Sequence, residues 1–249
     1  AMVSFTADWQ GKDARAMAVV RLLFDESPLI KWQIDLDSRG TDLRVEMVFR
    51  TAVSGDISAG MPFDNVSRPI VDENLLPREL STDMASVLLG QRELNHVTMF
   101  PFHDYVSVSD GETAVSILAK GLRGYRAESE GVIIMPLRRA VEWLTAANLE
   151  NRVGDAGPFF YVPDARCERV VRHELAAAIG LDEVDSVAFQ AANAAFQNPP
   201  LIVENKADGQ QTSWQLLQED VPVTALFMQD DTVLARFHNP TSQMRPLAL

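Results

Sequence analysis

Cysteine is nearly absent from this sequence, and histidine is scarce. The only cysteine among 249 residues is Cys167, which excludes an internal disulfide and a multi-cysteine zinc site. None of the four histidines has a second histidine or cysteine at the short spacing typical of zinc ligands. They are His96, His103, His173 and His238. The sequence therefore contains no compact metal-binding motif.

Long apolar runs and an excess of basic residues are also missing. No run approaches the roughly 20 apolar residues that cross a bilayer, and no basic segment followed by an apolar one marks a signal peptide. The net charge of −13 argues against nucleic acid or an anionic membrane as partner, because phosphate binding needs excess lysine and arginine. We expect a cytoplasmic protein, and a neutral ligand such as a sugar is compatible with its charge.

Recognisable catalytic patterns are lacking too. No serine lies in a nucleophile-elbow pattern, and Cys167 has no nucleophile context. The pairs His103-Asp104 and His173-Glu174 are adjacent in sequence, but neighbouring side chains on a strand point to opposite faces. Adjacency therefore does not make either pair one site.

Alternating apolar and polar residues dominate what is present, in an ordinary globular composition of 47% hydrophobic and 23% charged residues. Segments 30–36 and 43–49 alternate on either side of a turn-rich stretch, which predicts an antiparallel hairpin. A second hairpin is predicted for 105–117 around Asp110-Gly111, and another for 223–237. A further strand is expected at 132–135. The dominant class is therefore β.

Two segments favour helix instead. Asp164 to Ile179 begins with a capping residue and precedes Gly180, and Asp182 to Phe196 is rich in alanine. Asn198-Pro199-Pro200 then ends any helix. It predicts a boundary between a large unit, 1–197, and a smaller unit, 198–249, although one compact domain is an alternative.

One passage of the sequence contains a Leu-Arg element, an arginine, Ala-Gly-Pro and a Pro-x-x-x-Cys turn, found in 136–144, 148–152, 154–158 and 163–167. This passage resembles family 38 α-mannosidases of the bacterial type, which are glycoside hydrolases. Further matches, in sequence order, lie at 62–69, 106–111, 121–125, 196–200 and 235–240. The resemblance spans nearly the whole chain.

The resemblance implies a mainly β fold. This is a large antiparallel β-sandwich, the supersandwich also found in galactose mutarotases, with few short helices and a small terminal β unit. It also implies a strand rather than a helix over Cys167 to Ala176. The parent would be a retaining α-mannosidase whose N-terminal domain supplies zinc, or another divalent metal, and an Asp nucleophile. This chain would then be the non-catalytic C-terminal fragment, without a cofactor of its own.

The same resemblance implies the partners and two substrate-binding residues. The partners would be the catalytic domain and a mannose-containing oligosaccharide or mannoside, and a homo-oligomer is left open. Arg138 would face the substrate cleft, with a structural ion pair as its alternative. Tyr125 is the second candidate, with a packed aromatic role as its alternative. No catalytic or metal-binding residue is assigned to this chain.

Two other functions stay open at this point. An independent carbohydrate-binding β-sandwich would present an exposed aromatic platform, for which the tryptophans are Trp9, Trp32, Trp143 and Trp214. The alternation at 30–36 places Trp32 on an apolar face and so favours the core for it. A free-standing mutarotase-like sugar epimerase would use His103 or His173 with a carboxylate as acid and base.

Overall fold

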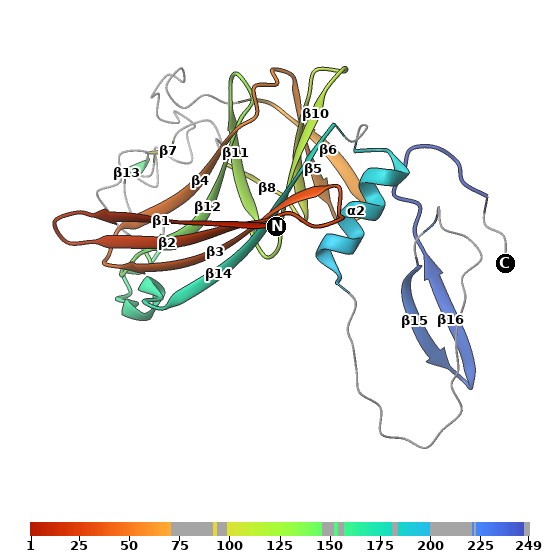
Figure 1. Cartoon of the computed structure of the whole chain (residues 1–249). Helices are drawn as coiled ribbons and strands as arrows, with labels where there is room; N and C mark the ends of the chain where they lie inside the picture. The colour runs from red at the N-terminus through yellow and green to blue at the C-terminus, as the bar shows by residue number, and fades with distance from the viewer. Residues whose placement is uncertain are drawn as a thin grey trace. The chain divides into compact units, whose positions relative to one another are not determined.

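The chain contains two compact units, Ala1–Gly180 and Leu181–Leu249. A computed structural model describes residues 1–70, 92–93, 99–145, 152–153, 157–180, 184–199, 221 and 223–246. Figure 1 shows these elements in chain order. The division between the units falls after Gly180, whereas the sequence predicted a boundary after residue 197.

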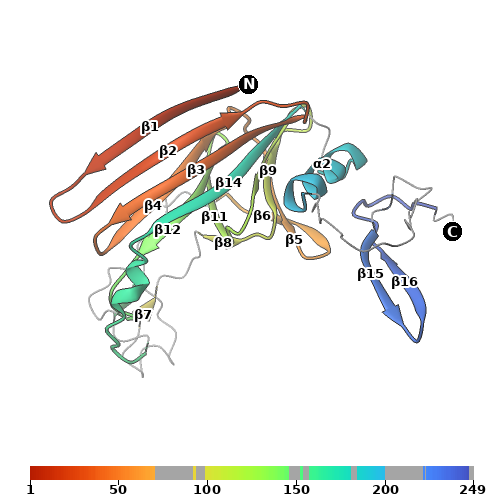
Figure 2. The same cartoon turned by 60° about the horizontal axis from the view of Figure 1, so that its bottom comes forward.

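The larger sheet of the first unit has eight strands, and each pairs antiparallel with its neighbours. Its spatial order is β1-β2-β3-β14-β10-β9-β5-β6. In that order the strands are β1 (Met2–Gln10), β2 (Arg15–Leu23), β3 (Leu29–Arg39), β14 (Val170–Ile179), β10 (Ala114–Ala119), β9 (Tyr105–Ser109), β5 (Asp56–Met61) and β6 (Asp64–Arg68). Figure 2 shows β1 at the margin of this sheet.

A smaller sheet of four strands has the order β4-β12-β11-β8. Its strands are β4 (Leu43–Arg50), β12 (Val132–Ala140), β11 (Gly124–Glu128) and β8 (Phe100–Pro101). A separate short pair joins β7 (Arg92–Glu93) to β13 (Arg152–Val153).

The hydrophobic core lies between the apolar faces of these two sheets. The larger sheet supplies residues such as Ile34, Ile117 and Leu175, and the smaller sheet supplies residues such as Ile133 and Met135, all at most 2% exposed. Burial of such side chains is the main stabilising contribution to a sandwich. The predicted mainly β, antiparallel sandwich is therefore confirmed.

Ring contacts fix how far the smaller sheet reaches across the larger one. The rings of Trp32 on β3 and Phe49 on β4 lie 5.7 Å apart, centre to centre, in an edge-on arrangement. The guanidinium carbon of Arg68 on β6 lies 5.7 Å from the ring centre of Phe100 on β8. The two edge strands of the smaller sheet therefore lie against β3 and β6, and β1 lies outside this span.

The hairpin predicted for 30–36 and 43–49 is wrong. Both strands exist, but β3 pairs with β2 and β14, while β4 pairs with β12 of the other sheet. The turn at 40–42 therefore carries the chain between sheets, with Gly40 and Asp42 at positive φ. Alternation identifies the buried face of a strand but does not identify its neighbour, so the sequence could not distinguish hairpin from crossover.

The other predicted strands are confirmed. β9 and β10 form the hairpin around Asp110-Gly111, and β12 contains the strand predicted at 132–135. The prediction did not include β1 and β2, whose alanines Ala7, Ala16 and Ala18 weaken the β signal.

The prediction of a helix at 164–179 from propensity is wrong. The strand implied by the family resemblance is confirmed. Only Pro163–Arg166 is helical, as the single 3₁₀ turn η1, and it ends at Cys167 with φ 49°. β14 follows, and it pairs with β3 on one side and β10 on the other. Pairing on both edges outweighs the helix propensity of its alanines.

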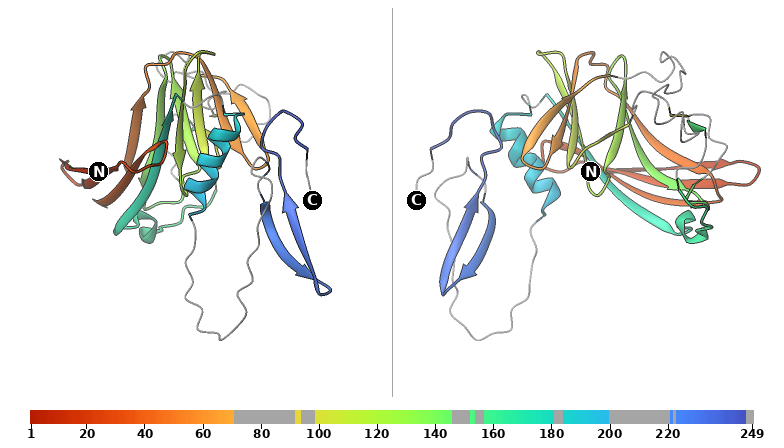
Figure 3. Two further views of the ribbon diagram at one scale, coloured as in Figure 1. Left: turned by 45° about the vertical axis from the view of Figure 1, so that its right-hand side comes forward. Right: turned by 180° about the vertical axis from the view of Figure 1, so that it is seen from behind.

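The second unit contains the predicted alanine-rich helix and the terminal hairpin, drawn in cyan and blue in Figure 3. Helix α2 (Val187–Gln197) starts at Ser186, whose hydroxyl oxygen accepts a 3.1 Å hydrogen bond from the Phe189 amide. β15 (Val223–Gln229) pairs with β16 (Thr232–Phe237). Among the described helices, none has the length and apolar character needed to cross a bilayer.

Candidate functional site

Arg138 lies on β12 and points toward the inside of the sandwich because of a β-bulge. The register shifts between Pro136 and Arg138, so Arg138 lies opposite Val45. Val45 belongs to the same row of β4 as Met47 and Phe49, which contribute to the core. In a regular register Leu137 would lie opposite Val45, and Arg138 would point to the other face.

The guanidinium of Arg138 binds the backbone between η1 and β14. It donates to the carbonyl oxygens of Arg166 and Cys167, and to that of Arg169 at 3.2 Å. Only 7% of the residue is exposed. The site therefore joins the smaller sheet to the connection that enters the larger one.

These contacts bear on the two roles considered for Arg138. The guanidinium donates to carbonyl oxygens rather than to a carboxylate, so the structural role has a different chemistry from the ion pair considered. Because several of its N–H groups are engaged, Arg138 is suited to hold the 166–169 backbone in place. Direct contact with a substrate stays a prediction.

Tyr125 lies on β11 inside the core. It is 0% exposed, and its ring centre lies 6.0 Å from that of Phe102 and 6.2 Å from that of Phe100. Its hydroxyl has no hydrogen-bond partner within the described part of the chain. Burial raises the pKa of this hydroxyl to about 12. This environment is that of a packed aromatic residue, and substrate binding by Tyr125 stays a prediction.

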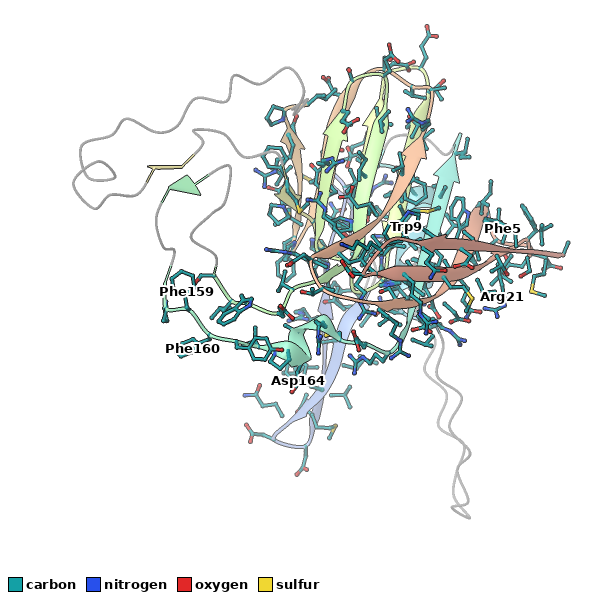
Figure 4. All side chains as sticks on the ribbon, turned by 90° about the vertical axis from the view of Figure 1, so that its left-hand side faces the viewer. Phe5, Trp9, Arg21, Phe159, Phe160 and Asp164 are labelled. Atoms are coloured by element: carbon teal, nitrogen blue, oxygen red, sulfur yellow. The ribbon has the colours of Figure 1, made fainter. Side chains whose placement is uncertain are left out.

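Four exposed aromatic residues lie on the segments that flank η1 on its N-terminal side. Trp143 forms an isolated antiparallel bridge with Tyr161, and their ring centres are 5.2 Å apart. The amide of Leu144 donates to the carbonyl of Phe160 at 2.9 Å, and that of Val162 donates to the carbonyl of Glu142 at 2.7 Å. We call Trp143, Phe159, Phe160 and Tyr161 the aromatic cluster; each is 48–55% exposed. Figure 4 labels Phe159 and Phe160 on this segment.

Polar groups lie next to the aromatic cluster. The carboxylate of Asp164 on η1 is exposed, and Figure 4 shows it beyond Phe160. Glu142 and Arg166 form an ion pair at 3.9 Å, and the Thr145 hydroxyl donates to the carbonyl of Pro158 at 3.1 Å. Aromatic faces beside polar groups can pack on the apolar side of a sugar ring while the polar groups bind its hydroxyls.

Sequence reasoning identified part of this site. Trp143 was among the tryptophans considered for a platform, and it is exposed, whereas Trp32 is half-buried against the core. Trp214 and His96 lie outside the described residues, as do most of 148–152 and the start of 154–158. Phe159, Phe160 and Tyr161 were not identified, although three consecutive aromatic residues after Gly157-Pro158 were a local signal.

The remaining histidines that were considered lie in different environments. His103 is exposed, while His173 on β14 is 7% exposed and burial lowers its pKa. The described residues contain no group of three histidine, cysteine, aspartate or glutamate side chains that could hold a metal. A surface depression lies at the N-terminal end of β12, whereas Arg138 lies near the C-terminal end of that strand. The depression is lined by Arg50, Ala52, Ser54, Glu130 and Val132.

Two solved structures share the fold of this chain. One is described as a protein in glycosyl hydrolase family 38 from Enterococcus faecalis, with a TM-score of 0.64 and 20% identity. The other is an alpha-mannosidase from Enterococcus faecalis V583, with a TM-score of 0.65 and 21% identity. Each alignment covers 92% of this chain and 24% of the other. This chain therefore spans about a quarter of the length of these proteins and has the fold of that segment.

A structure from Klebsiella pneumoniae, described as a candidate aldose 1-epimerase, aligns with a TM-score of 0.33 and 11% identity, which is too low for any inference. No protein-family model and no curated protein sequence matches this chain.

Proposed function

We propose that this chain is the non-catalytic C-terminal β-sandwich domain of a retaining α-mannosidase. It supports the catalytic domain and completes the cleft that binds a mannoside. The observation that carries the proposal is the shared fold, which covers 92% of this chain but 24% of the α-mannosidase from Enterococcus faecalis V583.

The proposal assigns the chemistry to another domain. Retaining hydrolysis needs a nucleophilic carboxylate and an acid/base carboxyl group about 5–5.5 Å apart. In the proposed arrangement the catalytic domain holds these groups together with zinc or another divalent metal. The contribution of this chain is to bind and orient the mannoside.

Within this function, the aromatic cluster and the 166–169 backbone are the features suited to a cleft wall. The rings of Trp143 and Tyr161 offer apolar faces, and Asp164 offers a carboxylate that accepts hydrogen bonds from sugar hydroxyls. Arg138 acts as a positioning residue, because it holds the backbone that follows η1.

Kinetic complementation tests the proposal. The catalytic region of the parent α-mannosidase is produced without this segment, and kcat/KM for an aryl α-mannoside is measured before and after adding this chain. We expect kcat/KM to rise with chain concentration and to saturate. No change at any concentration, with no complex detected by sedimentation, would refute the proposed function.

The aromatic cluster also favours a second candidate, an independent carbohydrate-binding module. In that case the isolated chain binds a mannose oligosaccharide by calorimetry, and Trp143→Ala weakens binding about tenfold, the loss expected for one aromatic contact. The matched control is Phe227→Ala on β15, since Phe227 is 47% exposed and lies in the other unit. Absence of binding by the isolated chain contradicts this candidate but not the first.

A further inference from the structure

Strand β1 lies at the free margin of the larger sheet and is exposed along its full length. It pairs with β2 at nine positions, from Met2 opposite Leu23 to Gln10 opposite Arg15. Each of its nine residues is exposed. Among the described strands none pairs with its other edge. That edge therefore presents backbone N–H and C=O groups to solvent.

The side chains of β1 alternate as in a strand with one buried face. Val3, Phe5, Ala7 and Trp9 point to one side, and Met2, Ser4, Thr6, Asp8 and Gln10 point to the other. Phe5 lies opposite Val20 of β2, which lies opposite Ile34 of β3, a residue only 1% exposed. We call Val3, Phe5, Ala7 and Trp9 the β1 apolar row; it continues the core-facing layer of the sheet.

Nothing in the described part of the chain covers the β1 apolar row. Burial falls along one line of side chains, from Ile34 to Val20 at 6% exposed and then to Phe5 at 50%. The edge strand β4 of the smaller sheet lies against β3 through Phe49 and Trp32. Trp9, the last residue of the row, is 53% exposed. Figure 4 labels Phe5 and Trp9 on this strand.

The usual protection of an edge strand is missing from β1. Natural edge strands carry lysine, proline, bulges or inward-pointing charges that prevent association. The nine residues of β1 contain neither lysine nor proline, and their single charged residue, Asp8, points away from the apolar row. The pairing with β2 is also free of register shifts. Such a strand has the features of a protein-binding surface.

We propose that the β1 apolar row is the surface on which this chain docks the catalytic part of the longer protein. This inference rests on the proposed function. The two Enterococcus faecalis proteins that share this fold have 76% of their chain outside the shared segment, from 100% minus the 24% covered. A parent of that size has ample protein to cover the row.

Net charge and side-chain polarity favour this occupant over others. Two copies of the chain would each bring a net charge of −13 to a shared interface, which opposes self-association. A sugar would need several polar groups to bind its hydroxyls, and the indole N–H of Trp9 is the one polar side-chain group in the β1 apolar row. An apolar protein surface would bury the side chains of the β1 apolar row. Buried Phe5 and Trp9 would then supply the large aromatic contacts that are common at interface centres.

The test measures binding between this 249-residue chain and the separately produced catalytic region. Phe5→Asp and Trp9→Asp are each expected to weaken binding at least about tenfold, since buried aromatic contacts dominate interfaces. The matched control is Thr6→Asp, which places the same charge on the opposite face and is expected to change affinity less than about twofold. Circular dichroism verifies that each variant folds. Hydrogen exchange of the unmodified chain provides a second measurement, in which amides 2–10 gain protection in the complex.

Each other outcome has a separate meaning. If the unmodified chain binds, and Phe5→Asp and Trp9→Asp bind equally well without protection of β1, the docking surface is wrong and the proposed function stands. If the unmodified chain does not bind at all, the proposed function itself fails. If the chain forms a dimer that Phe5→Asp dissociates, the occupant is a second copy and the proposal is overturned.

Discussion

The Nη1 atom of Arg138 lies 3.2 Å from the carbonyl oxygen of Arg169, 31 residues further along the chain. The same guanidinium donates to the carbonyls of Arg166 and Cys167. This contact fixes the backbone where the chain leaves η1 and enters the centre of the larger sheet. The buried guanidinium of Arg138 and the three backbone carbonyls that it binds therefore organise this part of the molecule.

Replacing Arg138 should destabilise the fold locally. Arg138→Ala leaves carbonyl groups without their donors and is expected to cost about 2–4 kcal/mol of unfolding free energy. Hydrogen exchange at 166–169 should rise, and urea denaturation gives the energy. Arg139→Ala is the control, because Arg139 is the exposed neighbour. If Arg138→Ala leaves stability and exchange unchanged but abolishes mannoside binding, Arg138 contacts the ligand directly.

The hydroxyl of Tyr125 is a buried polar group, and its removal separates packing from binding. Tyr125→Phe retains the ring contacts with Phe100 and Phe102. It is expected to leave stability unchanged or raise it by up to about 1 kcal/mol, because the hydroxyl no longer has to be desolvated. Tyr125→Ala should cost about 3–5 kcal/mol through the cavity it creates. Weaker mannoside binding by Tyr125→Phe at unchanged stability would instead indicate a substrate contact.

Asp35 gives the larger sheet an acid-sensitive contact. Hydrogen bonds from Arg172, at 2.7 Å, and from Arg21, at 2.6 Å, lower the pKa of Asp35 to about 2. A carboxylate with a lowered folded-state pKa stabilises the fold above its unfolded pKa. That stabilisation is lost as pH falls from about 4 to about 2.

Asp35→Asn should therefore reduce stability at neutral pH by about 1 kcal/mol, allowing for solvent screening of this partly exposed cluster. The variant should also lose less stability than the parent chain between pH 4 and pH 2. Urea unfolding across that range measures both effects. Asp42→Asn, at an exposed turn position, is the control. An equal acid sensitivity in Asp35→Asn and the parent chain would contradict the assignment.

Two glycines at positive φ provide a matched test of the packing between the 51–53 segment and the smaller sheet. Gly131 has φ 69°, and a Cβ there would overlap the carbonyl oxygen of Val53, whereas Gly111 has φ 89° and open space around it. Gly111→Ala is expected to cost about 1 kcal/mol from backbone strain alone. Gly131→Ala adds a steric overlap and should cost at least about 3 kcal/mol. Equal thermal shifts for the two variants would contradict this packing.

Local signals were sufficient for the short hairpins but not for the order of the sheets. The Asp110-Gly111 turn predicts the β9–β10 pairing because its chemistry is contained in adjacent residues, and Gly111 adopts the positive φ that such a turn needs. The link from β3 to β4 looks similar in sequence but crosses between sheets. The alanines of β14 look helical, and only pairing with distant β3 and β10 makes them a strand.

The candidate site was predictable only where a residue type carried the signal. Arg138 was found through its resemblance to a family passage, but its carbonyl partners depend on a β-bulge and on the positive φ of Cys167. The aromatic cluster joins Trp143 to Tyr161 through one isolated bridge. No periodicity encodes a single bridge between irregular segments, so the sequence could not bring these rings together.

The most direct test of the account is an assay of this chain alone. Purified chain, with zinc added in excess, is incubated with an aryl α-mannoside across a range of substrate concentrations. Because the proposed function places the nucleophile, the acid/base group and the metal in another domain, the aryl group should be released at the rate of buffer alone. Saturable, zinc-dependent turnover that co-purifies with the chain would contradict it.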